Sequence, residues 1–277
     1  MNENRFAASF LVPGGLWLVV LFVVPLGFLL AISFGYTDDL GEAVYGTSLD
    51  NYSRVFDPDL LPVLVRSVGF ALATVVLCLL IGYPVAYYIA IFGGRWKNVL
   101  LALVVLPFFV NYLVRTYAWI AMLGDDGLVN GLLGGDLRFL NTPYAVIGGL
   151  VYGFLAFMIL PIYGSLDRMD PSLIEAGKDL YGSPWQTFRH VTLPHTRQGV
   201  LAGSVLVFLP AVGDFVAASL LGGPDEVMIG NLIQQQFQAS DNWPFGAALT
   251  VVLMLFLLVW MSLYLRSAAR EAKEAEA

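Results

Sequence analysis

The sequence is poor in the residues from which metal and disulfide sites are built. It contains one cysteine, Cys78, and two histidines, His190 and His195, in 277 residues. A lone cysteine excludes a disulfide framework and a cysteine-based metal site. The two histidines have no third ligand nearby in the sequence. We therefore expect no metal site.

Motifs for nucleotide binding and hydrolysis are also absent. No GxxxxGK[ST] phosphate-binding loop occurs, because the one Gly-Lys pair, Gly177-Lys178, continues into Asp179. Neither an HExxH sequence nor a Ser/His/Asp set indicates catalysis. We expect a protein that is not an enzyme and binds no cofactor of its own. If it moves a solute uphill, the energy must come from a partner or an ion gradient.

Charge is scarce and apolar residues abound. Charged residues make up 13% of the chain and hydrophobic residues 58%, with a mean hydropathy of +0.75, which is typical of membrane proteins. Six apolar runs each approach the ~20 residues that cross ~30 Å of hydrocarbon. We predict an all-α polytopic membrane protein, a single domain over residues 1–277. Its six transmembrane helices are expected near residues 10–34, 65–92, 99–122, 145–166, 199–221 and 245–265.

The basic residues indicate which side of the membrane each loop occupies. With six spans, both termini lie on the same side as the loop at about residues 167–197. Every lysine and arginine lies on that side except Arg54, Arg66, Arg115 and Arg138. Positive residues collect in the cytoplasm, so we expect both termini and this loop to be cytoplasmic. The opposite loops are acidic, which either concentrates cations or only solvates the surface.

The loop Asp170–Pro194, DPSLIEAGKDLYGSPWQTFRHVTLP, has the pattern of two short helices joined by an elbow. Asp170 can cap the first helix; alternatively Ser172 caps it, with Glu175 completing a capping box. Gly182 stands where a left-handed C-terminal cap belongs. Ser183 is expected to cap the second helix, which should end at Leu193-Pro194 because proline disfavours helix at the preceding residue.

These residues resemble the EAA loop of ABC-importer permeases, in which Glu-Ala-Ala is followed by Gly, a hydrophobic residue and Leu-Pro. The pattern is carried by Glu175, Ala176, Gly182, Val191, Leu193 and Pro194. Gly177 replaces the second alanine, and Tyr181 stands in the usual glycine position. The small Ala176-Gly177 pair would leave backbone bare for a partner. The resemblance implies ATPase coupling through Glu175, Ala176, Gly177, Leu180, Tyr181, Gly182, Leu193 and Pro194.

From about Asn51 onward, the chain is similar to the permease of spermidine/putrescine importers. It is carried by residues 106–117, Leu221-Gly222-Gly223, Ile229-Gly230-Asn231 and Asn242–Ala248. One departure is Ser219, where such permeases often have an acidic residue just before Leu-Leu-Gly-Gly.

The resemblance implies a permease subunit of an ATP-driven importer in the bacterial inner membrane, which moves a small cationic solute by alternating access. Its expected partners are a second homologous permease, two ATPase subunits that hold ATP and Mg, an extracytoplasmic solute-binding protein and membrane lipid, with no nucleic acid. Alternatives are a permease for an amino acid, opine or oxyanion, or an ion-coupled secondary transporter. The last should show a broken-helix ion site and inverted repeats, and neither stands out. A membrane scaffold is a further alternative.

Polar and aromatic residues inside the expected spans are candidates for the substrate path. Asp214 lies in the expected fifth span, where an ionisable residue is costly and indicates function. Aromatic faces and carboxylates suit ammonium groups. The candidates are Asp214, Phe109, Asn111, Tyr112, Tyr117 and Trp119. The alternative for each aromatic residue is packing or an interfacial position.

Arg115 and Asp214 are expected at a similar depth in the outer half of the bilayer, if their helices are straight and similarly tilted. Two roles for Asp214 then compete. Either it receives a substrate amine, or Arg115 holds it in an internal pair. Because Arg115 repels cations, we interpret it as structural; it can also extend outward to the interface.

Overall fold

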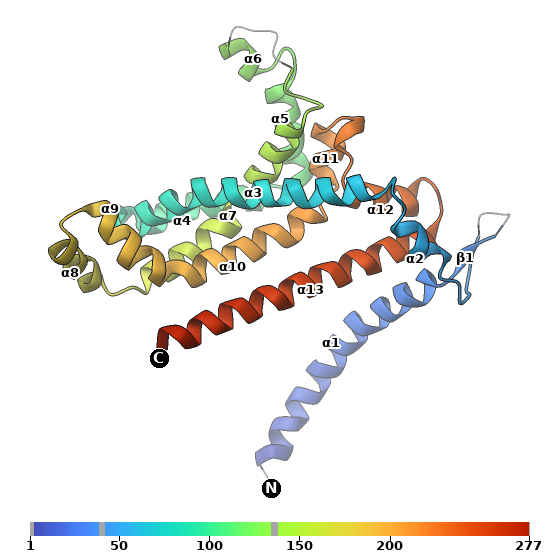
Figure 1. The fold of residues 1–277 in the computed structure, drawn as a ribbon, viewed down its shortest axis with the longest axis horizontal. Helices are drawn as coiled ribbons and strands as arrows, with labels where there is room; N and C mark the ends of the chain where they lie inside the picture. Colours follow the sequence, from blue (N-terminus) through green and yellow to red (C-terminus); the bar gives the residue numbers. More distant parts are fainter. Residues whose placement is uncertain (1–2, 39–41, 134–137, 277) are drawn as a thin grey trace. The chain divides into compact units, whose positions relative to one another are not determined.

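The computed structural model describes residues 3–38, 42–133 and 138–276, most of which lie in helices (Figure 1). The predicted helical fold is confirmed. Within the described residues, the strands are β1 (Tyr36–Thr37) and β2 (Ala43–Val44), which pair antiparallel.

The chain divides into two compact units. Unit 1 comprises Met1–Leu61 and Leu232–Val259, and unit 2 comprises Pro62–Asn231 and Trp260–Ala277. The single domain expected over residues 1–277 stays a prediction.

Unit 1 joins segments that are far apart in the sequence. It contains the strand pair, α1 (Glu3–Ser33), α2 (Asp50–Val55), most of α12 (Ile229–Gln238) and α13 (Trp243–Glu276) as far as Val259. The amide of Asn51 donates to the carbonyls of Ser33 and Gly35 at 3.2 and 2.8 Å, which satisfies acceptors at the end of α1. The Thr37 hydroxyl donates to the side chain of Asn242 at 3.1 Å. These bonds fix the loop that follows α1.

Unit 2 is built from the remaining helices. These are α3 (Leu61–Tyr87), α4 (Lys97–Val105), α5 (Tyr112–Leu123), α6 (Leu128–Leu133), α7 (Pro143–Asp167), α8 (Pro171–Tyr181), α9 (Pro184–Thr187), α10 (Leu193–Val212) and α11 (Val216–Leu221). Two π-helical turns, η1 (Tyr88–Phe92) and η4 (Phe188–Thr192), and three 3₁₀ turns, η2 (Gly94–Trp96), η3 (Leu106–Phe109) and η5 (Pro224–Glu226), connect them.

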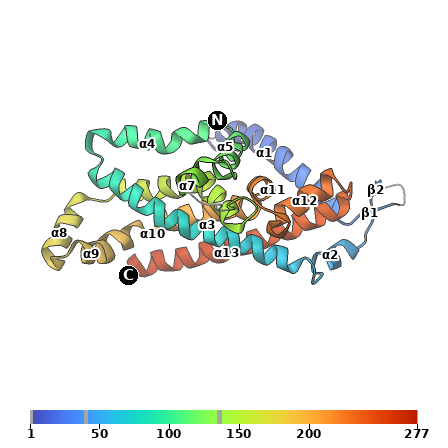
Figure 2. The same ribbon diagram turned by 90° about the horizontal axis from the view of Figure 1, so that it is seen from above.

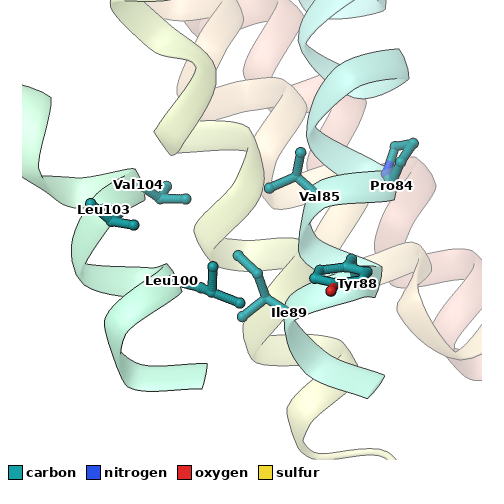
Figure 3. A pocket seen from close by; sticks show the side chains of 7 residues that line it. All are labelled: Pro84, Val85, Tyr88, Ile89, Leu100, Leu103 and Val104. Carbon is teal, nitrogen blue, oxygen red and sulfur yellow. The ribbon is translucent and has the colours of Figure 1, made fainter. Parts of the chain in front are cut away.

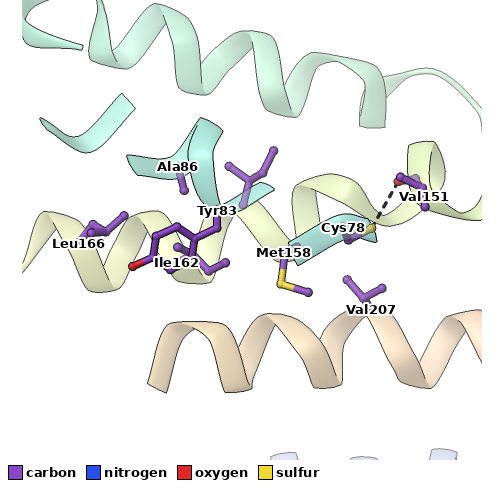
Figure 4. Packing of buried hydrophobic residues seen from close by; sticks show 9 residues of the cluster. Cys78, Tyr83, Ala86, Val151, Met158, Ile162, Leu166 and Val207 are labelled. Carbon is purple, nitrogen blue, oxygen red and sulfur yellow. Dashed lines mark hydrogen bonds between the residues drawn. The ribbon is translucent and has the colours of Figure 1, made fainter. Parts of the chain in front are cut away.

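The centre of unit 2 is the packing of α7 against α10, which run side by side (Figures 1 and 2). Gly199 and Gly203 lie one turn apart on α10. A Cβ on Gly203 would be 2.8 Å from the sulfur of Met158 on α7. Small residues at this spacing let membrane helices approach closely. Cys78 and Tyr83 of α3 pack onto the same buried cluster (Figure 4).

Only some of the six predicted spans are continuous helices. Among the described residues, the helices long and apolar enough to cross a membrane are Gly14–Ser33, Leu61–Phe92, Pro143–Asp167 and Trp243–Ser262. The predicted span 99–122 is bent by 93° between Phe109 and Tyr112, and becomes a fifth crossing if the two halves count as one. The predicted span 199–221 is divided between α10 and α11. Six spans are therefore not confirmed.

Side-chain caps start the helix that follows each break, α5 after Phe109 and α11 after α10. After Pro107, Val110 is extended and the side chain of Asn111 accepts from Leu113 N at 2.9 Å, which starts α5. Asp214 in the same way accepts from Ala217 N at 2.8 Å near the start of α11. A side chain that caps a new helix replaces backbone bonds of the preceding one. Such breaks are tolerated at membrane depth where the freed groups find other partners.

Candidate coupling loop and substrate path

The first helix of the predicted coupling loop, α8, is capped by Asp170, the first of the two predicted alternatives. Ser172 N donates to Asp170 Oδ1 at 2.9 Å, and this bond holds the pKa of Asp170 below its usual value. At the other end Gly182 adopts the left-handed conformation, with φ of 63°. Because a residue with a Cβ is strained there, glycine ends α8 sharply.

The second helix differs from the prediction at both ends. Ser183 is at the N-cap position of α9, but its hydroxyl accepts no capping bond. The expected end at Leu193-Pro194 is wrong, because the chain stays helical from α9 through η4 into α10. Pro194 lies in the first turn of α10, where its missing N–H is tolerated, and the π turn before it alters the regular bonding pattern.

Gly177, which replaces the second alanine of the EAA pattern, allows close packing inside the loop. Gly177 is buried, and a Cβ there would lie 2.9 Å from Cγ2 of both Thr187 and Val191. Its small size lets α8 pack against α9 and η4, so Gly177 is not part of the bare partner surface that the sequence predicts. The exposed predicted coupling residues are Glu175, Ala176, Leu180, Gly182, Leu193 and Pro194; the side chain of Tyr181 lies outside the described part.

Leu180 and Trp185 are the most exposed large apolar side chains of the loop. Leu180 is 79% exposed and Trp185 67% exposed. The Trp185 ring stacks on Phe188 at 5.4 Å between centroids, so it is held in place while remaining accessible. Sequence reasoning named Leu180 but not Trp185, although a tryptophan in the polar run SPWQTF is the signal that would have found it. Leu180 and Trp185 each present apolar surface that suits a protein partner.

The predicted substrate-path residues around α5 separate onto different faces. Phe109 is 84% exposed, Tyr117 is also exposed, and Asn111 uses its side-chain oxygen to cap α5. Tyr112 and Trp119 instead point toward α7. Gly153 makes room for the Tyr112 ring, since a Cβ there would be 2.9 Å from the ring.

Asp214 is buried in the break between α10 and α11, with only 9% of its surface exposed. Its carboxylate caps α11 through Ala217 N. The hydroxyl of Tyr112 lies near this carboxylate but lacks the geometry of a hydrogen bond. Gly230 packs directly on the Asp214 backbone, where a Cβ would be 3.0 Å from the carbonyl carbon and oxygen. The structure thus brings together two of the predicted residues, Tyr112 and Asp214, from distant parts of the sequence.

Arg115 lies on the same face of α5 as Tyr112 and is 8% exposed. Its guanidinium carbon is 5.3, 5.5 and 5.7 Å from the ring centroids of Phe108, Tyr112 and Tyr152. Arg115 and Asp214, both described, form no ion pair within 4.0 Å. Arg115 lies over the ring of Tyr112, whereas Asp214 lies near its hydroxyl.

Sequence reasoning did not identify Phe108 and Tyr152 at this site. Phe108 precedes the bend, so its position depends on a break that the sequence does not reveal. Tyr152 has a weak signal, because it stands beside Gly153 in an otherwise apolar helix. A glycine on a helix face often marks the close approach of another element.

An open apolar hollow of about 560 Å³ lies elsewhere in unit 2, between the end of α3 and α4 (Figure 3). It is lined by Pro84, Val85, Tyr88, Ile89, Leu100, Leu103 and Val104. No carboxylate or basic group lines it, so it lacks the groups that would bind a charged solute.

Three comparisons relate the chain to known proteins. Residues 79–273 match the family described as binding-protein-dependent transport system inner membrane component. The spermidine/putrescine transport system permease protein PotB of Haemophilus influenzae is 38% identical over 257 residues, which is 91% of this chain and 90% of that protein. PotB of Escherichia coli is 39% identical over 254 residues, 88% of this chain and 92% of that protein.

A solved structure shares the fold. It is a bacterial alginate ABC transporter in complex with alginate pentasaccharide-bound periplasmic protein, with a TM-score of 0.73 at 18% identity. The match covers 97% of this chain and 95% of that chain. At this identity the likeness concerns the arrangement of helices alone.

Proposed function

Because the chain belongs to the family of binding-protein-dependent transport system inner membrane components, we propose that it conducts spermidine and putrescine through the membrane. Membership makes it a multi-pass membrane permease of an ABC importer and not an enzyme. The polyamine assignment is carried by the likeness to two spermidine/putrescine permeases along most of the chain.

The chemistry of the site supports a cationic substrate. Asp214 places a carboxylate at a broken helix, with Tyr112 beside it. A buried carboxylate needs a cation to offset the cost of its burial. Aromatic rings contribute favourable cation–π contacts with an ammonium group. These groups meet the two requirements of a flexible polycation, which are charge pairing and an apolar surface for its methylenes.

The proposed topology has six crossings, in which the bent pair α4–α5 and the broken pair α10–α11 each count as one. Both termini and the coupling loop at about residues 167–197 are then cytoplasmic. Two ATPase subunits dock on the cytoplasmic loops of the permease pair, and on this chain the contact lies around Glu175, Leu180 and Trp185. A second permease completes the path, and a solute-binding protein delivers substrate from outside. Movement of the loop drives alternating access.

A second candidate function follows from Arg115. A buried guanidinium in the substrate path favours an anionic or zwitterionic solute, such as an amino acid, an opine or an oxyanion. The break at α10–α11, which no pattern in the sequence marks, is also a feature of ion-coupled secondary transporters. Membership of the family assigns the energy source to ATP instead.

Uptake by the complete transporter tests the proposal. The chain, its partner permease, the ATPases and the binding protein are reconstituted in proteoliposomes loaded with ATP. Labelled spermidine, putrescine, glutamate and molybdate are then compared as substrates. We expect ATP-dependent uptake of the two polyamines alone. Uptake of glutamate or molybdate without polyamine uptake would show that the second candidate is correct.

A further inference from the structure

Arg115 is a cation held among groups that suit other cations equally well. The rings of Phe108, Tyr112 and Tyr152 surround its guanidinium at 5.3 to 5.7 Å. Several aromatic faces around one positive charge are the arrangement by which proteins recognise alkylammonium groups. We call these three residues the aromatic cage.

Two of the three guanidinium nitrogens of Arg115 make no hydrogen bond in the aromatic cage. These two atoms, Nε and Nη1, are buried. The carboxylate of Asp214, which lies near the Tyr112 hydroxyl, forms no ion pair with the guanidinium. Buried donors without acceptors are costly, so the cage retains Arg115 less firmly than a hydrogen-bonded ion pair would. Another cation can therefore compete for the same position.

We propose that the aromatic cage binds an ammonium group of the substrate, a proposal that rests on the proposed polyamine transport. The Arg115 side chain occupies the cage as a competitor tethered to the protein. Asp214, near the Tyr112 hydroxyl, supplies the negative charge for the ammonium group that enters. The long side chain of Arg115 can leave by extending toward the interface. In the absence of substrate, Arg115 fills the cage and excludes stray cations.

Direct binding of labelled spermidine tests this arrangement. The probe is titrated into the assembled permease–ATPase complex in lipid nanodiscs, without ATP and without the binding protein. Arg115→Gln should lower the dissociation constant about tenfold or more, because apparent affinity scales with the fraction of molecules whose site is vacant. Arg115→Lys should keep the weak binding of the wild type, since its ammonium group also fills the cage.

Arg66→Gln is the matched control for loss of a positive charge. Arg66 donates to the carbonyl of Val227, so its removal should leave spermidine binding unchanged. Equal affinities in Arg115→Gln and Arg66→Gln would overturn the inference. If Arg115→Gln does not assemble, Arg115→Met fills similar space without charge and carries the same expectation.

The location of the site is tested in the Arg115→Gln background. Adding Tyr152→Leu should remove the gain in affinity, whereas adding Tyr152→Phe should keep it, because only the aromatic face is required. A gain that persists with Tyr152→Leu would show that the ammonium binds elsewhere.

The two proposals fail in different ways. Spermidine uptake by the complete wild-type transporter supports the proposed function whatever Arg115 does. Wild-type uptake together with unchanged binding in Arg115→Gln overturns the inference alone. Absence of polyamine uptake by the wild type overturns both.

Discussion

Replacing Gly177 by alanine tests how the coupling loop is held together. The new Cβ would lie 2.9 Å from two methyl groups, where ordinary contact begins at 3.4 Å, so each methyl must move by about 0.5 Å. Both belong to β-branched side chains, Thr187 and Val191, which have little rotamer freedom in a helix. Overpacking costs about 1–3 kcal/mol, and the better helix propensity of alanine returns about 1 kcal/mol. A net cost near 1 kcal/mol would lower the ratio of packed to displaced α8 roughly fivefold.

ATP hydrolysis stimulated by spermidine and the binding protein, measured in nanodiscs, should fall in Gly177→Ala, by at most this factor. Gly164→Ala is the matched control, since nothing lies within 4 Å of a Cβ at that position of α7. Adding Val191→Ala to Gly177→Ala should recover much of the loss. If Gly177→Ala hydrolyses ATP as well as Gly164→Ala does, α8 is not tightly packed here and the reasoning is refuted.

Three further predictions concern the loop and the path. Asp214→Asn should keep the cap of α11 and the thermal stability of the complex, while polyamine uptake falls at least about tenfold. Asp214→Ala should lower both the thermal stability and the uptake. Normal uptake by Asp214→Asn would exclude a role for the charge. Because the folded pKa of Asp170 is depressed, its cap stabilises α8 above the unfolded value of about 3.9 and is lost as the pH falls through the lower folded pKa. Hydrogen exchange in α8 should therefore show an acid-induced loosening that is absent in Asp170→Asn, and identical profiles would contradict this. Leu180→Ser with Trp185→Ser should leave the chain in the membrane but release the ATPase subunits on co-purification, and full retention of the ATPases would remove this surface from the docking site.

Helix-capping patterns in the sequence predicted both ends of α8 in the coupling loop. The cap at Asp170 and the left-handed Gly182 depend on residues within a few positions of each other, so the sequence is sufficient to identify them. The continuation through Pro194 was not predictable in this way, because it depends on a π turn that no simple pattern marks. The burial of Gly177 also depends on Thr187 and Val191 across the elbow, and that contact requires the tertiary fold.

The candidate path shows the same division between local and distant information. Tyr112 and Trp119 share one face of α5, since seven residues separate them on one helix. All four aromatic residues were predicted from their type and their place in the expected spans, and the structure exposes Phe109 and Tyr117. Tyr152 joins the site from α7, a helix that the sequence does not place beside α5.

The relation between Arg115 and Asp214 shows why counting residues along spans fails in this chain. A depth obtained from 1.5 Å per residue assumes a straight helix. The chain turns by 93° just before Tyr112, so the residues of α4 do not measure the depth of Arg115. The helix that leads to Asp214 ends at Val212, because the Asp214 carboxylate caps α11 instead of continuing α10. The count to Asp214 still holds to within two residues, because α10 is continuous as far as Val212. The bend before Tyr112 is what undermines the comparison, and the charge of Arg115 is left to the aromatic rings.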